Sequence, residues 1–316
     1  MDYFSNRKKI LLPPSLRKGD KIAILSPASE IKEEYINGAV SKIFERGYKP
    51  VVMAHTVGHE KGSYSSELTS RLSDLKQAIE DPDIKAILCG RGGYGCVHLL
   101  AYLSPEIILK NPKWMIGYSD VSALHALWNH AGVASIHGPM AKHLAIEVPE
   151  DQCSEALFDI LENDGSFEYL VPSTPLNNCG KAKGVLRGGN FAVLNGLADT
   201  PFDLLKIKED EDVILFLEDI SEAIYAVERM MYRLYYAGTL NRMKGLIIGQ
   251  FTQYKSDKNF DTMEEMIHSL FKKLKIDKVP VVYNFPVGHV SLNFPLVEGV
   301  EVELEASPGQ VCLRSV

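Results

Sequence analysis

The chain of 316 residues contains no apolar run near the length of about 20 residues that a membrane-spanning helix requires. It also has no long basic stretch, and its formal net charge is −7, so the electrostatic footprint of a nucleic-acid-binding protein is missing. Its five cysteines are scattered and include no Cys-x-x-Cys pair, which favours reduced thiols over a disulfide framework or a zinc site. Residues 1–17 are polar and basic and lack the apolar segment of a secretory signal, so we expect a cytoplasmic protein.

What remains is an ordinary globular composition, long enough for about two domains with sizeable cores. In the first half, short apolar segments alternate with segments of helical periodicity, a pattern typical of an α/β domain with a parallel sheet covered on both faces. The expected strands are 21–26, 50–53, 84–89, 114–118 and 133–136, and the expected helices are 33–46 and 65–80. In such sheets the ligand site lies at the carboxyl ends of the strands.

The second half is more mixed and predicts a smaller α/β domain with its own sheet. Its expected strands are 213–217, 245–249, 280–285 and a terminal hairpin of 300–304 with 311–314, and its expected helices are 221–236 and 262–274. A helix at 151–162 precedes a proline-rich, loop-like stretch. We therefore predict an N-terminal domain over 1–165, a linker over 166–179 and a C-terminal domain over 180–316.

The stretch 113–120 reads as a buried strand, and an amphipathic helix follows it at once. Ser119 lies at the junction, and a serine on a sharp strand-to-helix turn has the geometry of a nucleophile elbow. The helix N-terminus would direct backbone N–H groups at an oxyanion formed beside the serine. The alternative is that Ser119 or Asp120 is simply the N-cap of the helix.

A glycine-rich turn, Gly90-Arg-Gly-Gly-Tyr-Gly95, follows the third expected strand. It matches G-x-G-x-x-G, but it does not follow the first strand, and the acidic partner of a dinucleotide site is misplaced, because only Asp120 is available. A loop without side chains can instead bring backbone N–H groups close to a reacting carbonyl. A tight turn without any ligand is the third interpretation.

A serine nucleophile needs a histidine base. His125 and His130 lie within or at the end of the helix after Ser119, which is a poor position for reaching back to its hydroxyl. His55 and His59 are four residues apart but lack the glutamate of a His-Glu-x-x-His site, so we expect a surface loop there. His289 follows a strand on a loop, where catalytic side chains are common.

The base in turn needs an orienting acid, and two neighbours compete for that role. Glu218 ends the strand 213–217, and Asp219 follows it. Either acid could instead cap the next helix and favour its positive end. Spacing alone does not choose between them.

Several motifs occur in a fixed order: Arg91-Gly-Gly-Tyr-Gly95, Ile116-Gly-Tyr-Ser-Asp120, His137-Gly-Pro139, Leu186-Arg-Gly-Gly-Asn190, Phe216-Leu-Glu-Asp219 and Phe285-Pro-Val-Gly-His289. Together they resemble the LD-carboxypeptidase family, which includes muramoyltetrapeptide carboxypeptidases and microcin C self-immunity peptidases. The resemblance runs from about Leu16 to the C-terminus. The turn at Ser119 is Gly-x-Ser-Asp rather than the full G-x-S-x-G elbow, so the chain is not assigned to the α/β-hydrolases.

The resemblance implies a serine peptidase triad with Ser119 as nucleophile, Glu218 as acid and His289 as base. It places the oxyanion hole on the backbone N–H groups of Asp120 and of Gly92 or Gly93. It also implies an N-terminal domain like that of the class I glutamine amidotransferases, with a smaller C-terminal domain that supplies Glu218 and His289.

The implied substrate is a small peptide with an L-to-D bond at its C-terminal end, such as the murein tetrapeptide that loses its terminal D-alanine during cell-wall recycling. No metal or organic cofactor is implied, and family members are commonly homodimers. The candidate substrate-binding residues are Arg91, Tyr94, Arg187 and Asn190. Each arginine could instead pair with an acid of the fold, and Asn190 could cap the following helix.

Two other functions stay open on the sequence. Within the same family, the substrate could be a peptide–nucleotide antibiotic of the microcin C type. In a different class, the chain could be a non-catalytic binder of a nucleotide or small molecule that uses the turn from Gly90 to Gly95.

Overall fold

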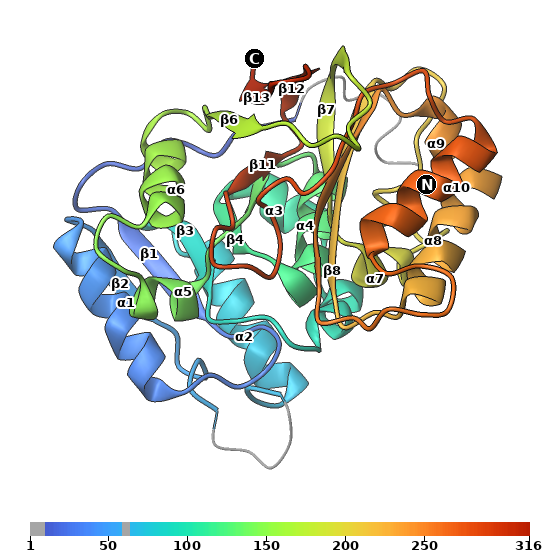
Figure 1. The fold of residues 1–316 in the computed structure, drawn as a ribbon. Helices are drawn as coiled ribbons and strands as arrows, with labels where there is room; N and C mark the ends of the chain where they lie inside the picture. Colours follow the sequence, from blue (N-terminus) through green and yellow to red (C-terminus); the bar gives the residue numbers. More distant parts are fainter. Residues whose placement is uncertain (1–9, 59–63) are drawn as a thin grey trace. The chain divides into compact units, whose positions relative to one another are not determined.

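The computed structural model describes residues 10–58 and 64–316, which form two compact units (Figure 1). The first unit runs to Gly165 and also contains Phe294–Gly299, and the second contains Ser166–Asn293 and Val300–Val316. Each unit is built around its own sheet, with six strands in the described part of the first and seven in the second. The predicted α/β class with two sheets is confirmed, whereas the likeness to class I glutamine amidotransferases stays a prediction.

The sheet of the first unit has the order β11-β5-β4-β3-β1-β2. All neighbours from β5 to β2 pair in parallel, and the central strands are almost wholly buried, as expected for a sheet that is covered on both faces. The strands are β1 (Lys21–Leu25), β2 (Lys49–Val52), β3 (Ile84–Cys89), β4 (Trp114–Gly117), β5 (Ser135–His137) and β11 (Leu296–Glu298).

The helices of the first unit fall into two groups. Helix α1 packs against α5, and α3 packs against both α2 and α4. Trp114 on β4 and Trp128 on α4 are fully buried, as expected of core residues. The helices are α1 (Glu33–Glu45), α2 (Leu68–Glu80), η1 (Cys96–Tyr102), α3 (Pro105–Lys110), η2 (Ser119–Val121), α4 (Ser122–Ala131), α5 (Ala141–Ile146) and α6 (Gln152–Glu162).

Strand β11 corrects the predicted domain organisation. We expected all of 180–316 to belong to the C-terminal domain, but Phe294–Gly299 belongs to the first unit. There β11 pairs antiparallel with β5, so that Leu296 lies opposite His137 and Glu298 lies opposite Ser135. A three-residue edge strand whose partner lies some 160 positions earlier in the chain leaves no local pattern to predict it.

The sheet of the second unit has the order β10-β9-β8-β7-β12-β13-β6. Strands β7 to β10 pair in parallel, and the remaining pairs are antiparallel. The strands are β6 (Glu168–Pro172), β7 (Gly180–Asn190), β8 (Val213–Ile220), β9 (Gly245–Thr252), β10 (Val281–Val282), β12 (Glu301–Ala306) and β13 (Gln310–Ser315). The expected linker 166–179 therefore contains a strand, β6, whose Tyr169 and Val171 are buried while their neighbours are exposed. That period-2 alternation was the signal for it.

The helices of the second unit are α7 (Phe191–Asn195), α8 (Ile224–Tyr236), α9 (Thr239–Arg242) and α10 (Met263–Leu274). Helix α10 begins at a capping box, in which the Thr262 side chain accepts the backbone N–H of Glu265 and the Glu265 side chain accepts that of Thr262. Helices α8 and α10 pack against each other. None of the helices in the described ranges is long and apolar enough to cross a membrane.

Candidate active site

Ser119 lies on the turn between β4 and α4. Tyr118 still has extended backbone, but Ser119 has a φ of 66°, in the left-handed region that residues with a side chain rarely adopt. The chain then enters η2 and α4 directly. Ser119 is half-buried and lies at the carboxyl end of β4, a buried strand. A positive φ at this position is the backbone geometry of a nucleophile elbow.

The alternative role of Ser119 or Asp120 as a helix cap receives no support. Tyr118 occupies the N-cap position of η2 and Val121 that of α4, and no side chain caps either element. The buried carboxylate of Asp120 instead accepts the backbone N–H of Cys96 at 2.8 Å. Burial raises the pKa of Asp120 above its ordinary value, against the lowering effect of that hydrogen bond.

The glycine-rich turn passes directly over Ser119. A Cβ added to Gly92 would lie 2.8 Å from the Cβ and 2.9 Å from the Oγ of Ser119, so only glycine fits without displacement. Gly93 has a φ of 123°, and a Cβ there would collide with the Oγ of Ser29. Within residues 10–58 and 64–316, no acceptor pairs with the backbone N–H of Gly92 or Gly93. The backbone of Gly92 therefore lies close to the Ser119 side chain.

The same turn does not have the form of a dinucleotide site. It leads into the 3-10 helix η1 rather than an α-helix. The first N–H of η1, that of Cys96, is already taken by the carboxylate of Asp120. An anion-binding position at this helix N-terminus is thus occupied from within the protein.

Arg91 and Tyr94 are the two side chains of this turn that we considered for substrate binding. Arg91 is half-buried and forms no ion pair with any residue in the described part of the chain, so pairing with an acid of the fold is not seen there. The ring of Tyr94 is 53% exposed and contacts the rings of Tyr64 and His98. Tyr94 thus presents an aromatic surface next to the glycines.

In the second unit, Glu218 and His289 form a close pair. The Oε2 atom of Glu218 lies 2.7 Å from the Nδ1 atom of His289. The carboxylate is fully buried, whereas the imidazole is 14% exposed. A buried carboxylate that accepts the Nδ1–H of a histidine holds the ring in the tautomer whose Nε2 can take up a proton.

Two glycines and an irregularity between strands make room for this pair. The β8–β9 register shifts between Leu217 and Asp219, so that Glu218 faces one extra residue of β9. Such bulges redirect side chains next to active sites. A Cβ on Gly288, which has a φ of 125°, would lie 2.9 Å from both the Cβ and Oε2 of Glu218, and one on Gly249 would lie 3.2 Å from the Cβ of Glu218. The glycine before His289 is therefore required both by conformation and by space.

Asp219 has a different environment from its neighbour. Its carboxylate accepts the backbone N–H groups of Ala192 and Ile220 and the side-chain amide of Asn190. Burial, followed by the negative charge of Glu218, raises the pKa of Asp219 to about 7. Of the two acids that spacing left open, Glu218 contacts His289, while Asp219 ties β8 to the start of α7.

Asn190 and Arg187 both have partners within the fold. The side chain of Asn190 accepts the N–H of Val193 at 3.1 Å and so caps α7, which was the alternative role. Arg187 forms a two-pronged ion pair with Glu211, at 3.1 and 3.0 Å. Although burial alone would raise it, hydrogen bonds from Arg187 hold the pKa of Glu211 below its ordinary value. Neither side chain is shown to face a ligand.

Of the histidine pair His55 and His59, His55 has a partner within the fold. The Nδ1 atom of His55 lies 2.8 Å from a carboxylate oxygen of Asp74, which also accepts the backbone N–H of His55 through its other oxygen. His59 lies outside the described residues.

The comparisons with known proteins agree with this organisation. Residues 22–138 match the LD-carboxypeptidase N-terminal domain, and residues 183–304 match the LD-carboxypeptidase C-terminal domain. The "Probable murein peptide carboxypeptidase" of Bacillus subtilis strain 168 is 28% identical, covering 93% of this chain and 92% of that protein.

Two solved structures are similar over nearly the whole chain. The muramoyltetrapeptide carboxypeptidase of Oxalobacter formigenes has a TM-score of 0.82 at 26% identity, covering 93% of this chain and 98% of that one. An MccF-like protein of Bacillus anthracis strain Ames has a TM-score of 0.83 at 25% identity, covering 97% and 100%. MccF itself is the microcin C7 self-immunity protein of Escherichia coli.

The fold and the family matches together identify this chain as a hydrolase of the serine peptidase class. The two matches span more than half of the chain, which belongs to the LD-carboxypeptidase family.

Proposed function

We propose that this protein is a serine carboxypeptidase that removes the C-terminal D-alanine from murein tetrapeptide, with Ser119 as nucleophile, His289 as base and Glu218 as orienting acid. The observation that carries the proposal is the fully buried carboxylate of Glu218, which lies 2.7 Å from the Nδ1 atom of His289. A fully buried acid paired with a partly exposed imidazole is the arrangement that a peptidase triad requires. The left-handed backbone of Ser119 supports the role of that residue.

In this mechanism, neutral His289 accepts the hydroxyl proton of Ser119 through Nε2 while the serine oxygen attacks the carbonyl carbon of the scissile bond. Glu218 stabilises the resulting imidazolium. The backbone N–H groups of Gly92, Gly93 and Asp120 are the proposed donors to the tetrahedral oxyanion. His289 then protonates the leaving amine of D-alanine, and a water molecule, activated by the same histidine, hydrolyses the acyl-enzyme.

Arg91 is the proposed partner for the terminal carboxylate of the substrate. An exopeptidase must recognise that carboxylate, and a guanidinium can hold it with two parallel hydrogen bonds. Arg91 lies beside Gly92, next to the proposed oxyanion donors, and has no ion-pair partner within the described ranges. Tyr94 would contribute an aromatic wall on the same turn.

A role in peptidoglycan recycling, a cytoplasmic location and a homodimeric state complete the proposal. They follow from the family resemblance. Gel filtration with light scattering would test the dimer directly.

The deciding experiment is mass-spectrometric analysis of L-Ala-γ-D-Glu-meso-diaminopimelate-D-Ala after incubation with three proteins: wild type, Ser119→Ala and Ser104→Ala. Ser104 caps α3 in the same unit, where its side chain accepts the N–H of Glu106, so its loss costs only about 1 kcal/mol of stability. We expect D-alanine from wild type and Ser104→Ala and none from Ser119→Ala. Equal release by Ser119→Ala would remove Ser119 as the nucleophile.

A second substrate tests the other specificity found among the structural relatives. The same proteins would be incubated with an aminoacyl sulfamoyl adenosine, a peptide–nucleotide analogue of the microcin type. Cleavage of that compound by wild type, without any release of D-alanine from the tetrapeptide, would move the substrate to the microcin class while keeping the peptidase mechanism.

A further inference from the structure

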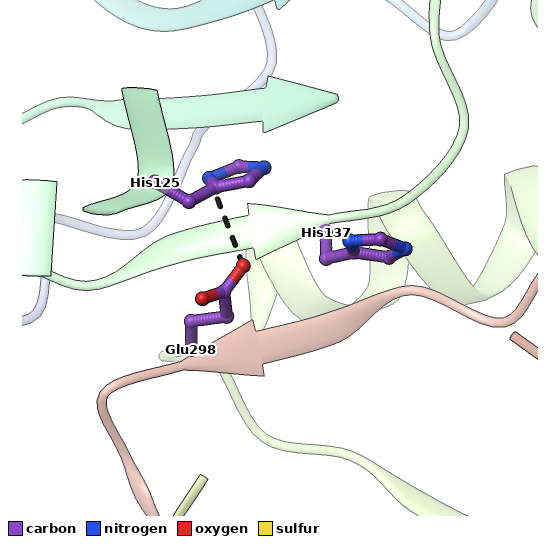
Figure 2. A group of neighbouring side chains, drawn as sticks. All are labelled: His125, His137 and Glu298. Carbon is purple, nitrogen blue, oxygen red and sulfur yellow. Dashed lines mark ion pairs between the residues drawn. The ribbon is translucent and has the colours of Figure 1, made fainter. Parts of the chain in front are cut away.

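Three buried side chains that the proposed mechanism does not use converge in the first unit. They are His125 on α4, His137 at the end of β5 and Glu298 at the end of β11, and each is fully buried (Figure 2). One ring nitrogen of each histidine and one carboxylate oxygen lie within 4.8 Å of one another. Imidazole nitrogens and a carboxylate oxygen are the donor types that Zn²⁺ takes in proteins.

The strand register explains how the group assembles. Glu298 lies directly opposite Ser135, and directly opposed residues of an antiparallel pair share a face of the sheet. His137 is two residues beyond Ser135 on β5, so it lies on that same face. Helix α4 packs against β5 and supplies His125. The Ser135 hydroxyl, also fully buried, has no hydrogen-bond partner among the described residues.

The hydrogen bonding of His125 identifies its tautomer. Its Nε2 atom lies 2.8 Å from the carbonyl oxygen of Gly117, and a carbonyl only accepts, so Nε2 carries the hydrogen. In the neutral ring the Nδ1 atom presents a lone pair, 4.0 Å from the Oε1 atom of Glu298. A cation held between these two atoms would be attracted by both electron pairs.

A metal ion fits this arrangement with little movement. Nitrogen and oxygen ligands lie about 2.0–2.2 Å from Zn²⁺, so two ligands of one tetrahedral ion are roughly 3.5 Å apart. Nδ1 of His125 and Oε1 of Glu298 lie 4.0 Å apart, and the three ligand atoms lie within 4.8 Å of one another, so rotation of the Glu298 side chain would have to bring the carboxylate closer. The Gly117 carbonyl on the opposite nitrogen of His125 is the outer-shell partner that metal-binding histidines usually have.

We propose that His125, His137 and Glu298 bind one divalent transition-metal ion, with Zn²⁺ favoured by the donor set, as a structural clamp. The clamp would fasten β11 to β5 and to α4. The same helix follows Ser119, and the Gly117 carbonyl lies two residues before it, so the clamp would also support the turn that carries the serine. The proposal does not depend on the substrate or on the mechanism, and it goes beyond the expectation that no metal is involved.

The test is metal binding by the full-length chain, purified without a histidine tag. The protein would be stripped with a chelator and titrated with ZnSO₄ while its melting temperature is measured, and CoCl₂ would serve as a spectroscopic probe. We expect one equivalent bound per chain, visible absorption bands of Co²⁺ in a nitrogen and oxygen site, and a rise in Tm of roughly 5 °C on adding Zn²⁺.

The matched variants are Glu298→Gln and His143→Gln. Glu298→Gln keeps the size of the side chain and should lose the Co²⁺ bands and the stabilisation by Zn²⁺. His143 is paired with Asp151 elsewhere in the first unit, so His143→Gln should keep both. If wild type binds neither ion, or if Glu298→Gln binds as wild type does, the proposal is overturned and a proton or a buried water links the three side chains. The wild-type titration decides this even if Glu298→Gln fails to fold.

Discussion

The two sheets of this protein present their functional groups by different means. In the first unit, the backbone itself carries the strain, because Ser119 has a left-handed φ at the end of a parallel strand. In the second unit, Glu218 keeps ordinary strand geometry, and space for it comes from a register shift and from Gly249 and Gly288. Both sites lie at the carboxyl ends of parallel strands, where α/β sheets place their ligands.

In the proposed function, this difference follows from what each group would have to do. A nucleophile has to be exposed, and a turn lifts its hydroxyl away from the sheet at the cost of about 1–2 kcal/mol in backbone conformation. An orienting acid has to be buried with one partner, so the surroundings must be emptied of other side chains. Backbone strain thus positions Ser119, whereas the absence of neighbouring side chains makes room for Glu218.

The largest expected effect is a difference in activity between variants of Glu218 and of its neighbour on β8, Asp219. Glu218→Gln should lower kcat for D-alanine release by about 10⁴-fold, because an amide facing Nδ1 favours the wrong tautomer of the histidine. Asp219→Asn, one residue later, should change kcat by less than about tenfold, since Asp219 binds backbone groups rather than His289. Steady-state kinetics on both variants would check this, and a larger loss in Asp219→Asn would reverse the two roles.

The glycine-rich turn gives the next effect. In Gly92→Ala the new methyl group would lie within 3 Å of the Ser119 side chain, displacing either the serine or the proposed oxyanion donors. We expect kcat to fall by about 10²–10³-fold, comparable to the loss of one oxyanion-hole donor. Gly309→Ala is the control, because a Cβ there meets nothing within 4 Å. Equal activity of the two variants would exclude a catalytic role for this part of the turn.

Asp219 predicts a pH dependence of stability. Its pKa is raised to about 7 in the folded protein, mainly by burial and then by Glu218. Between about pH 4 and about pH 7, the folded chain therefore holds a proton that the unfolded chain has released, so this group's contribution to the free energy of unfolding falls as pH rises. The loss is on the order of 4 kcal/mol.

Urea unfolding at pH 5 and pH 8 would measure this loss in the free energy of unfolding. Relative to Asp219→Asn, wild type should be more stable at pH 5 than at pH 8. A difference between the two proteins that does not change with pH would show that Asp219 titrates normally.

The smallest effect tests the strain at Ser119. Glycine adopts a left-handed φ without penalty. The free energy of unfolding of Ser119→Gly should therefore be about 1 kcal/mol higher than that of Ser119→Ala. Both variants lack the hydroxyl, and their comparison therefore isolates the backbone. Equal stabilities would mean that the left-handed conformation is not maintained in solution.

Much of this could be predicted because the signals were local. The parallel strands can be recognised as apolar runs. Ser119 directly follows one of them, and His289 lies on the loop after another. The position of Ser119 on a turn follows from its place between strand and helix. Its positive φ does not, because that depends on the glycine turn packing over it.

What could not be predicted depends on pairing between distant segments. Glu218 and Asp219 are equivalent in sequence, and only the register between β8 and β9 distinguishes the acid that reaches His289. The roles of Arg187 and Asn190 were ambiguous for the same reason. In the fold, Arg187 pairs with Glu211 and Asn190 caps α7. The group of His125, His137 and Glu298 had no signal at all, because β11 alone brings the glutamate there.

Strand β11 also bears on how the protein is made. The sheet of the first unit acquires its sixth described strand only when residues 296–298 have left the ribosome, some 160 residues after β5. Until then the edge of β5 is unpaired, and exposed strand edges favour pairing with other chains. A nascent chain, or a fragment that stops at Gly165, would thus expose an aggregation-prone edge that β11 covers in the folded protein.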